Sequence, residues 1–148
     1  MLSHFEQRQL PYTPQQMFDL VAGVDQYSEF APWCVASRIN HWESETIFTA
    51  DLVVGYTVFR ERFSSRVILD PHKELYIAYL KGPLKKLKNK WVFKDDGQGG
   101  CVIDFSVDFE FQNGALQALA TMFFNEVVKR MVDAFEKRAE SLYSPFQQ

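Results

Sequence analysis

The sequence predicts an α+β fold in which a curved antiparallel sheet of seven strands packs on one long C-terminal helix, with two short helices after the first strand. Between residues 35 and 111, apolar residues recur with a period of two, which is typical of strands with one buried face. Residues 113–143 instead repeat apolar residues at helical spacing. With 148 residues, the chain is long enough to bury a single core.

The C-terminal helix is the element around which the rest of the chain is organised. At 100° per residue, its apolar side chains cover well over half of the circumference, and charged residues share the remaining sector. A face this wide is either wrapped by a curved sheet or shared between a sheet and an enclosed apolar ligand. Its residues are Leu116, Leu119, Ala120, Phe123, Phe124, Val127, Val128, Met131, Val132 and Phe135.

Before the main run of strands, the chain is expected to form one strand and two short helices. Residues 5–10 alternate apolar and polar residues and stop at Pro11, as a short strand does. Thr13 followed by Pro14 predicts the N-cap and first position of a helix whose apolar face is broken near Gly23. A second short helix over 25–30 ends before a proline, because the residue preceding proline disfavours helical backbone.

Six further strands follow, over residues 35–43, 47–54, 58–69, 75–80, 87–94 and 101–111, separated by turns rich in glycine, proline and aspartate. The alternation assigns two faces to the sheet, because apolar and aromatic residues fall on one side and charged residues on the other. Seven twisted strands curl, and a helix lying in the curl does not fill it evenly along its length. We therefore expect a tunnel-like cavity between sheet and helix.

Composition limits the classes of protein to consider. The net charge is −3, with acids and bases spread along the chain, which gives no argument for DNA binding. Cys34 and Cys101 lack metal-ligand spacing, so we expect no metal site and free thiols in a reducing compartment. No signal peptide and no apolar run near the ~18 residues of a membrane span is visible. We expect one domain over residues 1–148, located in the cytoplasm.

No catalytic constellation stands out, so no catalytic residue is assigned and the chain is not expected to be an enzyme. The three histidines have no nucleophile motif near them. Glu61, Ser65 and Asn89 are the polar residues that share parity with inward apolar ones. They are either strand-end groups satisfied by water or groups that orient the polar part of a ligand.

Lysines concentrate on one predicted hairpin. The simplest interpretation is a solvated strand face; otherwise the hairpin contacts anionic lipid headgroups, with roughly 1 kcal/mol per cation, or ribosomal RNA. These residues are Lys81, Lys85, Lys86, Lys88 and Lys90.

Several short motifs occur in an order that resembles the Coq10 family, a branch of the START-like, polyketide cyclase-like superfamily of lipid-binding proteins. The resemblance covers roughly residues 5–142 and implies a helix-grip fold that binds ubiquinone or a related polyprenyl quinone as a ligand, without a cofactor. A bacterial ribosome association toxin family is closely related, but it tends to carry glycine at the position of Trp33. The absence of a mitochondrial presequence fits a bacterial member. The motifs include Phe30-Ala31-Pro32-Trp33-Cys34, Gly82-Pro83-Leu84-Lys85, Trp91-Val92-Phe93 and Val107-Asp108-Phe109-Glu110-Phe111.

The resulting hypothesis is a carrier of ubiquinone that supports respiration and associates peripherally with the inner membrane. Phe30 and Trp33 are expected to form a movable lip. Two alternatives stay open: a ribosome-binding regulator that blocks subunit association, and a cyclase-like enzyme that uses Glu61 or Asn89. The predicted lining of the tunnel is Phe48, Leu52, Phe59, Phe63, Trp91, Phe105, Phe109, Phe123, Val127 and Met131.

Overall fold

The computed structural model describes the backbone of residues 1–56 and 59–143 and the side chains of residues 1–55 and 60–143. The predicted α+β architecture is confirmed. In chain order the elements are β1 (Leu2–Leu10), α1 (Pro14–Ala22), the 3-10 helix η1 (Val24–Glu29), β2 (Cys34–Trp42), β3 (Ile47–Tyr56), β4 (Phe59–Asp70), β5 (Glu74–Lys81), β6 (Leu84–Asp95), β7 (Cys101–Phe111) and α2 (Gly114–Tyr143).

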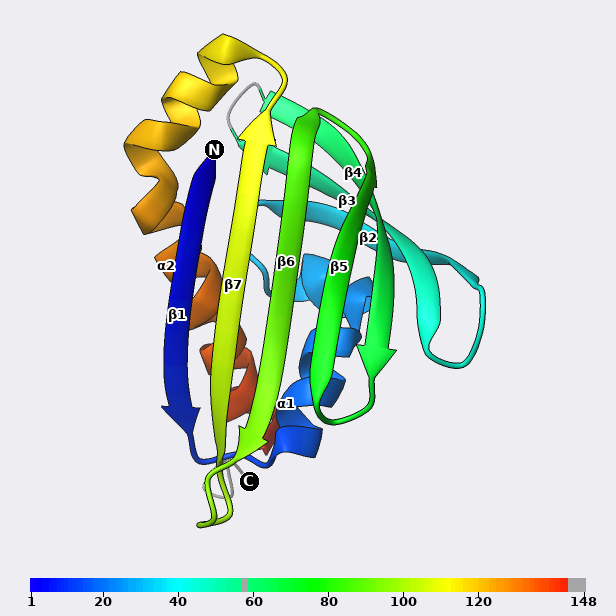
Figure 1. Ribbon diagram of the computed structural model, residues 1–148, viewed down its shortest axis with the longest axis vertical. Helices are drawn as coiled ribbons and strands as arrows, with labels where there is room; N and C mark the ends of the chain where they lie inside the picture. The colour runs from blue at the N-terminus through cyan, green and yellow to red at the C-terminus, as the bar shows by residue number, and fades with distance from the viewer. Residues whose placement is uncertain (57–58, 144–148) are drawn as a thin grey trace.

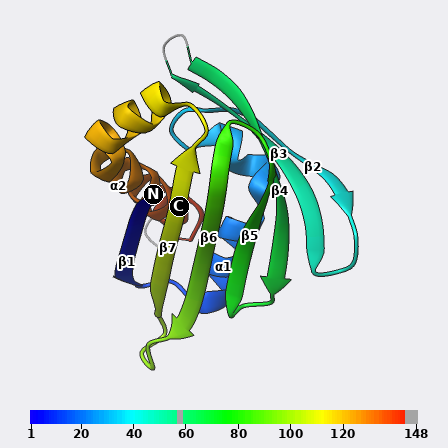
Figure 2. The ribbon, with the colours of Figure 1, turned by 45° about the horizontal axis from the view of Figure 1, so that its top comes forward.

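The seven strands form one antiparallel sheet in the order β1-β7-β6-β5-β4-β3-β2. The first strand therefore returns to the last, and β1 pairs with β7 from Leu2 opposite Phe109 to Leu10 opposite Cys101. Figure 1 views the sheet from its outer face, with α1 and α2 behind it. In Figure 2 the strands β2–β4 run at a marked angle to β1 and β7, so the sheet curves around the side that carries the helices.

Strict alternation places one set of side chains on the inner face of the sheet. In β3, Phe48 and Ala50 are buried, and their neighbours across the β3–β4 pair are Val67 and Ser65. The inner face of β7 carries Ile103, Phe105 and Val107, which are all buried. The outer face carries most of the charged residues, as the period of two predicted.

The two short helices differ in kind. Thr13 caps α1 by accepting a hydrogen bond from the amide of Gln16, whose side chain in turn accepts one from the amide of Thr13. This reciprocal capping box satisfies two amides that the first helical turn leaves unpaired. The second helix, η1, is a 3-10 helix of six residues, a form that is common in short connecting pieces.

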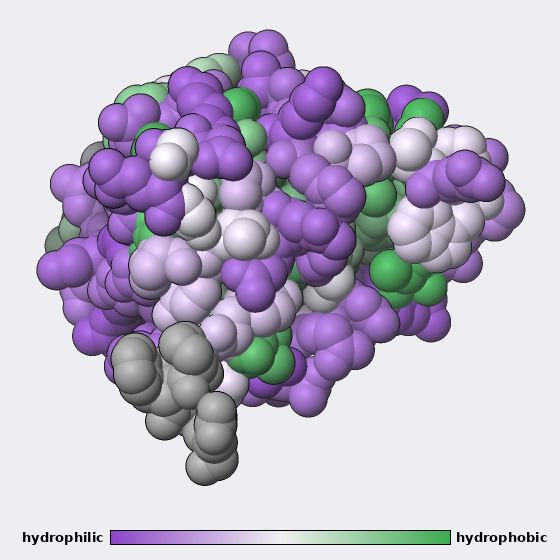
Figure 3. Space-filling view, turned by 90° about the horizontal axis from the view of Figure 1, so that it is seen from below, coloured by the Kyte–Doolittle hydropathy of each residue, from purple (hydrophilic) through white to green (hydrophobic). Residues whose placement is uncertain are grey.

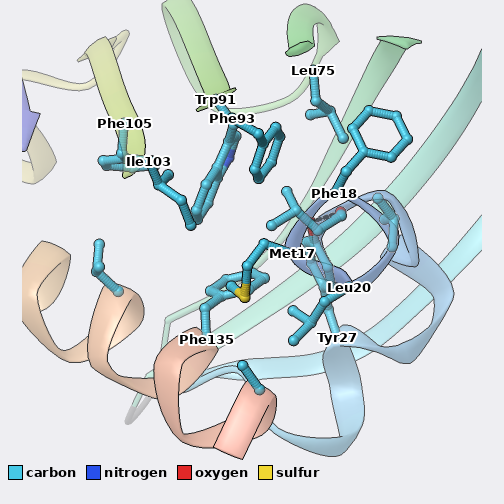
Figure 4. Close-up of a cluster of buried hydrophobic side chains, with 14 of the residues drawn as sticks. Met17, Phe18, Leu20, Tyr27, Leu75, Trp91, Phe93, Ile103, Phe105 and Phe135 are labelled. Carbon is cyan, nitrogen blue, oxygen red and sulfur yellow. Dashed lines mark hydrogen bonds between the residues drawn. The ribbon is translucent and has the colours of Figure 1, made fainter. Parts of the chain in front are cut away.

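The core lies where α1, η1 and the second half of α2 meet the inner face of the sheet (Figure 4). Phe135 of α2 is at its centre. Its ring centroid lies 5.1 Å from that of Tyr27, 5.0 Å from that of Phe30 and 5.1 Å from that of Trp91. These edge and tilted geometries are the ones that aromatic rings favour, so the core is dense at this end of α2.

No helix in the described part of the chain is both long and apolar enough to cross a membrane.

Candidate functional site

The two halves of α2 differ in exposure although they share one apolar pattern. In the second half, Val132, Phe135 and Ala139 are buried. In the first half, the apolar side chains of Leu119 and Met122 are 48% and 76% exposed. We call the two ends of the space between α2 and the sheet the closed end, next to α1, and the open end, next to the first half of α2 (Figure 1).

Neighbouring residues on the first half of α2 show which side of the helix is covered. Phe124 and Val128 are 7% and 4% exposed, whereas Phe123 and Val127 are 46% and 39% exposed. Phe124 packs on Phe109 of β7, with ring centroids 5.2 Å apart. One side of the helix therefore packs on the sheet, and the adjacent apolar side does not.

The uncovered side continues a stripe that reaches the core at the closed end. Phe123, Val127, Met131 and Arg138 follow one another at helical spacing and form one stripe along α2. At the closed end this stripe meets η1, because the guanidinium of Arg138 lies 5.2 Å from the centroid of the Phe30 ring. At the open end, Val127 and Phe123 continue the same stripe and remain exposed.

The sheet also presents partly exposed apolar side chains at the open end. Leu52 of β3, Phe63 of β4 and Leu87 of β6 have inward parity and are half-buried, as is Phe109 of β7. Phe59 lies outside the residues whose side chains are described. Two apolar surfaces that are both incompletely covered thus lie at the open end, which is the arrangement that a ligand with a long apolar part requires.

The closed end has almost no free volume. Phe48, Trp91 and Phe105, which were predicted to line the tunnel, are buried core residues that are 0%, 3% and 2% exposed. The void beside Trp91 and Phe105 measures about 20 Å³, which is room for about one water molecule. These three residues therefore support the fold at this end, and Figure 3 shows that the surface there is mostly hydrophilic.

The predicted lip residues are both half-buried. The Phe30 ring packs between Tyr27 and Phe135, with ring centroids 5.8 Å and 5.0 Å away. The backbone of Trp33 has φ +63°, a left-handed conformation that is uncommon for residues with a side chain. Its carbonyl oxygen accepts a hydrogen bond of 2.9 Å from the amide of Gly55 in β3, so this segment is attached to the sheet at the position of Trp33.

A charged cluster between β1 and α2 was not predicted. Arg8 donates to Glu6 on its own strand and to Asp133 on α2 at 2.9 Å, and it approaches Glu136 at 3.4 Å. Partial burial by itself would lower the pKa of Arg8, but the bonds to Glu6 and Asp133 raise it. His4 joins the cluster through a 3.1 Å contact with Glu6. Arg8 therefore ties the edge strand to the middle of α2.

The three inward polar residues named from the sequence, Glu61, Ser65 and Asn89, differ in their surroundings. The side chain of Asn89 donates to the carbonyl of Ser106 at 2.9 Å and accepts from the indole nitrogen of Trp91 at 3.2 Å. Asn89 thus has the ordinary role of a satisfied polar group. Ser65 is half-buried on β4, whereas Glu61 is exposed near the start of that strand.

The basic hairpin lies beside the open end. The amide of Gln112, just before α2, donates to the carbonyl of Pro83 at 3.1 Å, which places the β5–β6 turn next to the start of α2. Lys90 pairs with Glu74 at 3.0 Å, while Lys86 and Lys88 stand opposite Glu110 and Asp108 in the strand register. Acidic neighbours therefore partly neutralise the part of the patch on β6. Lys81 and Lys85 are exposed at the turn itself.

Comparison with known proteins identifies a matching family and relatives of two named kinds. A family model described as polyketide cyclase / dehydrase and lipid transport matches residues 10–136. The ribosome association toxin RatA of Pseudomonas aeruginosa is 36% identical over 134 residues, which cover 90% of this chain and 92% of that protein. The mitochondrial coenzyme Q-binding protein COQ10 homolog B of Xenopus laevis is 35% identical over 146 residues, or 96% of this chain and 59% of that protein.

A solved structure agrees with the fold. The Zhui aromatase/cyclase from a Streptomyces species superposes with a TM-score of 0.82, covering 95% of this chain and 94% of that one at 13% identity. At this identity, the similarity shows the shared architecture alone. The match over residues 10–136 shows that the chain belongs to the polyketide cyclase / dehydrase and lipid transport family, with a RatA and a COQ10 protein among its relatives.

Proposed function

We propose that the protein binds and carries a polyprenyl quinone such as ubiquinone, with the isoprenoid tail lying at the open end between α2 and the sheet. The observation that carries this proposal is the exposed apolar pair Phe123 and Val127 at the end of the molecule where inward side chains of the sheet are also incompletely covered. A tail laid against both surfaces gains roughly 25 cal/mol per Å² of apolar area removed from water. Long tails should therefore bind more tightly than short ones.

The open end suits the tail better than the closed end. A void of about 20 Å³ holds about one water, and an isoprenoid chain is far larger. We infer that Leu52, Phe63, Phe109, Phe123, Val127 and Met131 contact the ligand. Phe48, Trp91 and Phe105 hold the end of the site in shape, and Phe30 and Trp33 form its border.

The same end of the molecule supports a proposal of membrane contact. Leu119 and Met122 are exposed apolar side chains on the first half of α2, and Lys81 and Lys85 lie on the turn that Gln112 attaches to the start of that helix. Apolar residues beside cations suit the surface of an anionic bilayer, where each lysine contributes roughly 1 kcal/mol. We propose that this end rests on the inner membrane from the cytoplasmic side when the ligand is exchanged.

A carrier is favoured over an enzyme. The curated relatives at 36% and 35% identity are named as a ribosome association toxin and a coenzyme Q-binding protein. Asn89 is one of the two residues that a cyclase-like reaction would use, but its side chain is hydrogen-bonded to Trp91 and Ser106. Turnover of a polyketide substrate that is lost on changing both Glu61 and Asn89 would contradict this assignment.

The test is to incubate the protein with vesicles that contain ubiquinone, re-isolate it, extract it with organic solvent and measure bound quinone by mass spectrometry. We expect stoichiometric quinone with the native chain and none with Val127→Asp. Leu142→Asp is the matched control, because it adds the same charge to a 51% exposed site at the other end of α2. An empty extract from the native chain would overturn the proposal, and circular dichroism checks that each variant is folded.

A ribosome-binding regulator is the second candidate, because of the RatA relative at 36% identity. Contact with ribosomal RNA would depend on cations that have no acidic neighbour, so Lys81 and Lys85 matter more than Lys90 with its Glu74 partner. Co-sedimentation with ribosomal subunits at moderate salt tests this. Binding that Lys81→Glu with Lys85→Glu removes, and that Lys90→Glu leaves, would favour the regulator. Absence of any co-sedimentation would exclude it.

A further inference from the structure

The outer face of the sheet carries a hollow of about 440 Å³, on the opposite side from the core and from α2. It spans four strands, β2 to β5, and its size falls within the range of small-molecule sites. Most of the residues that line it are polar or charged, namely Asn40, Thr49, Asp51, Arg62, Ser64 and Lys81. Of these residues, the quinone proposal uses Lys81 alone, and it uses Lys81 for contact with the membrane and not for contact with the quinone.

Two β-bulges frame the hollow. Between β2 and β3 the register moves from Ile39 opposite Ala50 to His41 opposite Thr49, which leaves Asn40 as an extra residue. Between β4 and β5 it moves from Ser64 opposite Lys81 to Ser65 opposite Tyr79, leaving Leu80 as an extra residue. Both extra residues line the hollow. Bulges change the direction of side chains and are common next to functional sites. Here the extra residues of two bulges line the same hollow.

The wall formed by the β5–β6 turn is fixed in position. A Cβ added at Gly82, where φ is +147°, would lie 2.8 Å from both the carbonyl oxygen of Arg62 and the hydroxyl of Tyr79. The same hydroxyl accepts a hydrogen bond of 2.9 Å from the amide of Leu84. The turn is therefore packed directly on β4, which holds Lys81 beside Arg62.

A half-buried carboxylate forms the floor. The side chain of Asp51 is 12% exposed, accepts a hydrogen bond of 2.7 Å from Ser64 and lies 3.7 Å from the guanidinium of Arg38. Burial by itself would raise the pKa of Asp51. The hydrogen bonds from Ser64 and Asn40 and the charges of Arg38 and Arg62 outweigh burial and lower it. Asp51 is thus an oriented, ionised acceptor with lone pairs to spare.

The rim is positive. Within the described part of the chain, neither Arg62 nor Lys81 has a carboxylate within ion-pair distance, although both are exposed at the hollow. A guanidinium presents a planar fork of donors that matches phosphate, and an ammonium adds a compact charge beside it. The hydroxyls of Thr49 and Ser64 supply further hydrogen-bonding groups between the rim and the floor.

We propose that this hollow binds a sugar phosphate, with the phosphate held by Arg62 and Lys81 and a sugar hydroxyl donating to Asp51. Asp51 and Arg62 are diagonal neighbours across the β3–β4 pair, so an acceptor stands beside the cations, which matches an anionic group that carries neighbouring hydroxyls. A bare anion would use the rim alone. The site is on the other side of the sheet from the open end, so it stands or fails independently of quinone binding.

The experiment is an NMR titration of the full chain at constant ionic strength with three probes: ribose 5-phosphate, inorganic phosphate and ribose. We expect saturable shifts of the amide signals of Thr49, Ser64 and Lys81 with ribose 5-phosphate. Inorganic phosphate should bind at least about tenfold more weakly, because the hydrogen bond to a charged acceptor is missing. Absence of saturable shifts with ribose 5-phosphate would overturn the proposal.

Variants separate the site from general attraction of anions. Arg62→Gln should weaken ribose 5-phosphate binding at least about tenfold, whereas Lys88→Gln, the same kind of charge loss elsewhere on the outer face, should leave it unchanged. Equal weakening by both would overturn the proposal. Asp51→Asn should remove the preference for ribose 5-phosphate over inorganic phosphate while phosphate itself still binds. A preference that persists in folded Asp51→Asn would rule out the role of this carboxylate.

Discussion

The two halves of α2 carry the same apolar periodicity but have different surroundings. In the second half, α1, η1 and the inner face of the sheet all reach the helix, and Phe135 is 4% exposed. In the first half, β1 and β7 cover one side only, and Phe123 is 46% exposed. An apolar stripe on a helix thus shows that the helix has an apolar face, and the neighbouring elements decide whether that face becomes core or remains open.

This difference has an energetic meaning. A side chain in the closed end is removed from water by folding and stabilises the domain, so its loss leaves a cavity. A side chain at the open end is removed from water only when something else covers it, so its loss should affect binding more than folding. Substitutions of matched residue types in the two halves test this distinction.

The largest effect is expected for Phe135→Ala. Removal of a ring that packs on Tyr27, Phe30 and Trp91 should lower the free energy of unfolding by about 3–5 kcal/mol. Phe123→Ala is the matched change in the open half and should cost less than about 1 kcal/mol, since surface substitutions have small effects. Urea denaturation measures both. Similar losses for the two variants would show that the open end is also core.

Tyr27→Phe tests a buried polar contact of the closed end. The hydroxyl of Tyr27 donates to the carbonyl oxygen of Val21. Its loss leaves that carbonyl unpaired and should lower the free energy of unfolding by about 1–3 kcal/mol. Burial raises the pKa of Tyr27 above its ordinary value. The folded chain therefore favours the neutral phenol, which adds to the free energy of unfolding. This stabilisation is fully present below the unfolded pKa of about 10 and declines as the pH rises above it.

The pH dependence distinguishes this role from a loss of packing. Unfolding of the native chain should become easier above about pH 10, and Tyr27→Phe should have a flatter profile in that range. The comparison uses denaturation midpoints at neutral pH and at a series of alkaline values. Parallel profiles for the two proteins would show that Tyr27 does not link folding to ionisation.

Arg8→Gln tests the tie between the edge strand and the middle of α2, at the boundary of the two halves. The guanidinium bonds to Asp133 on the helix and to Glu6 on the strand, and its side chain is 22% exposed. Solvent screens such partly exposed pairs, so we expect a loss of about 1–2 kcal/mol. Lys129→Gln, on the same helix, should be neutral. An equally small effect for Arg8→Gln would reject the tie.

The fold was largely predictable because its signals are local. β7 has the predicted bounds of 101 and 111, since strict alternation of apolar and polar residues leaves one strand register. The Thr13-Pro14 start of α1 was found for the same reason, because capping chemistry involves residues only three apart. The end points of other strands, such as β6 from Leu84, depend on bulges and turns and were predicted less well.

The candidate site was less predictable because it depends on contacts distant in the sequence. Phe105 and Phe123 were assigned the same role, but only Phe105 is in the core. Which end of α2 is covered depends on where α1 and η1 pack, and periodicity alone does not contain that information. The Arg8 cluster was missed because its partners, Asp133 and Glu136, come from the far end of the chain. The even spacing of His4, Glu6 and Arg8 was the available signal.

The smallest effect concerns the two helix N-caps, which lie at opposite ends. Thr13 caps α1 at the closed end, while the side chain of Asn113 accepts a hydrogen bond of 2.8 Å from the amide of Ala115 at the open end. Thr13→Ala should lower global stability by about 1 kcal/mol. Asn113→Ala should instead let the first turn of α2 open locally, because little tertiary packing there couples it to global unfolding. Hydrogen exchange of amides 115–118 should accelerate while the denaturation midpoint stays nearly constant. A midpoint that falls as far for Asn113→Ala as for Thr13→Ala would mean that the open half of α2 is as firmly integrated as the closed half.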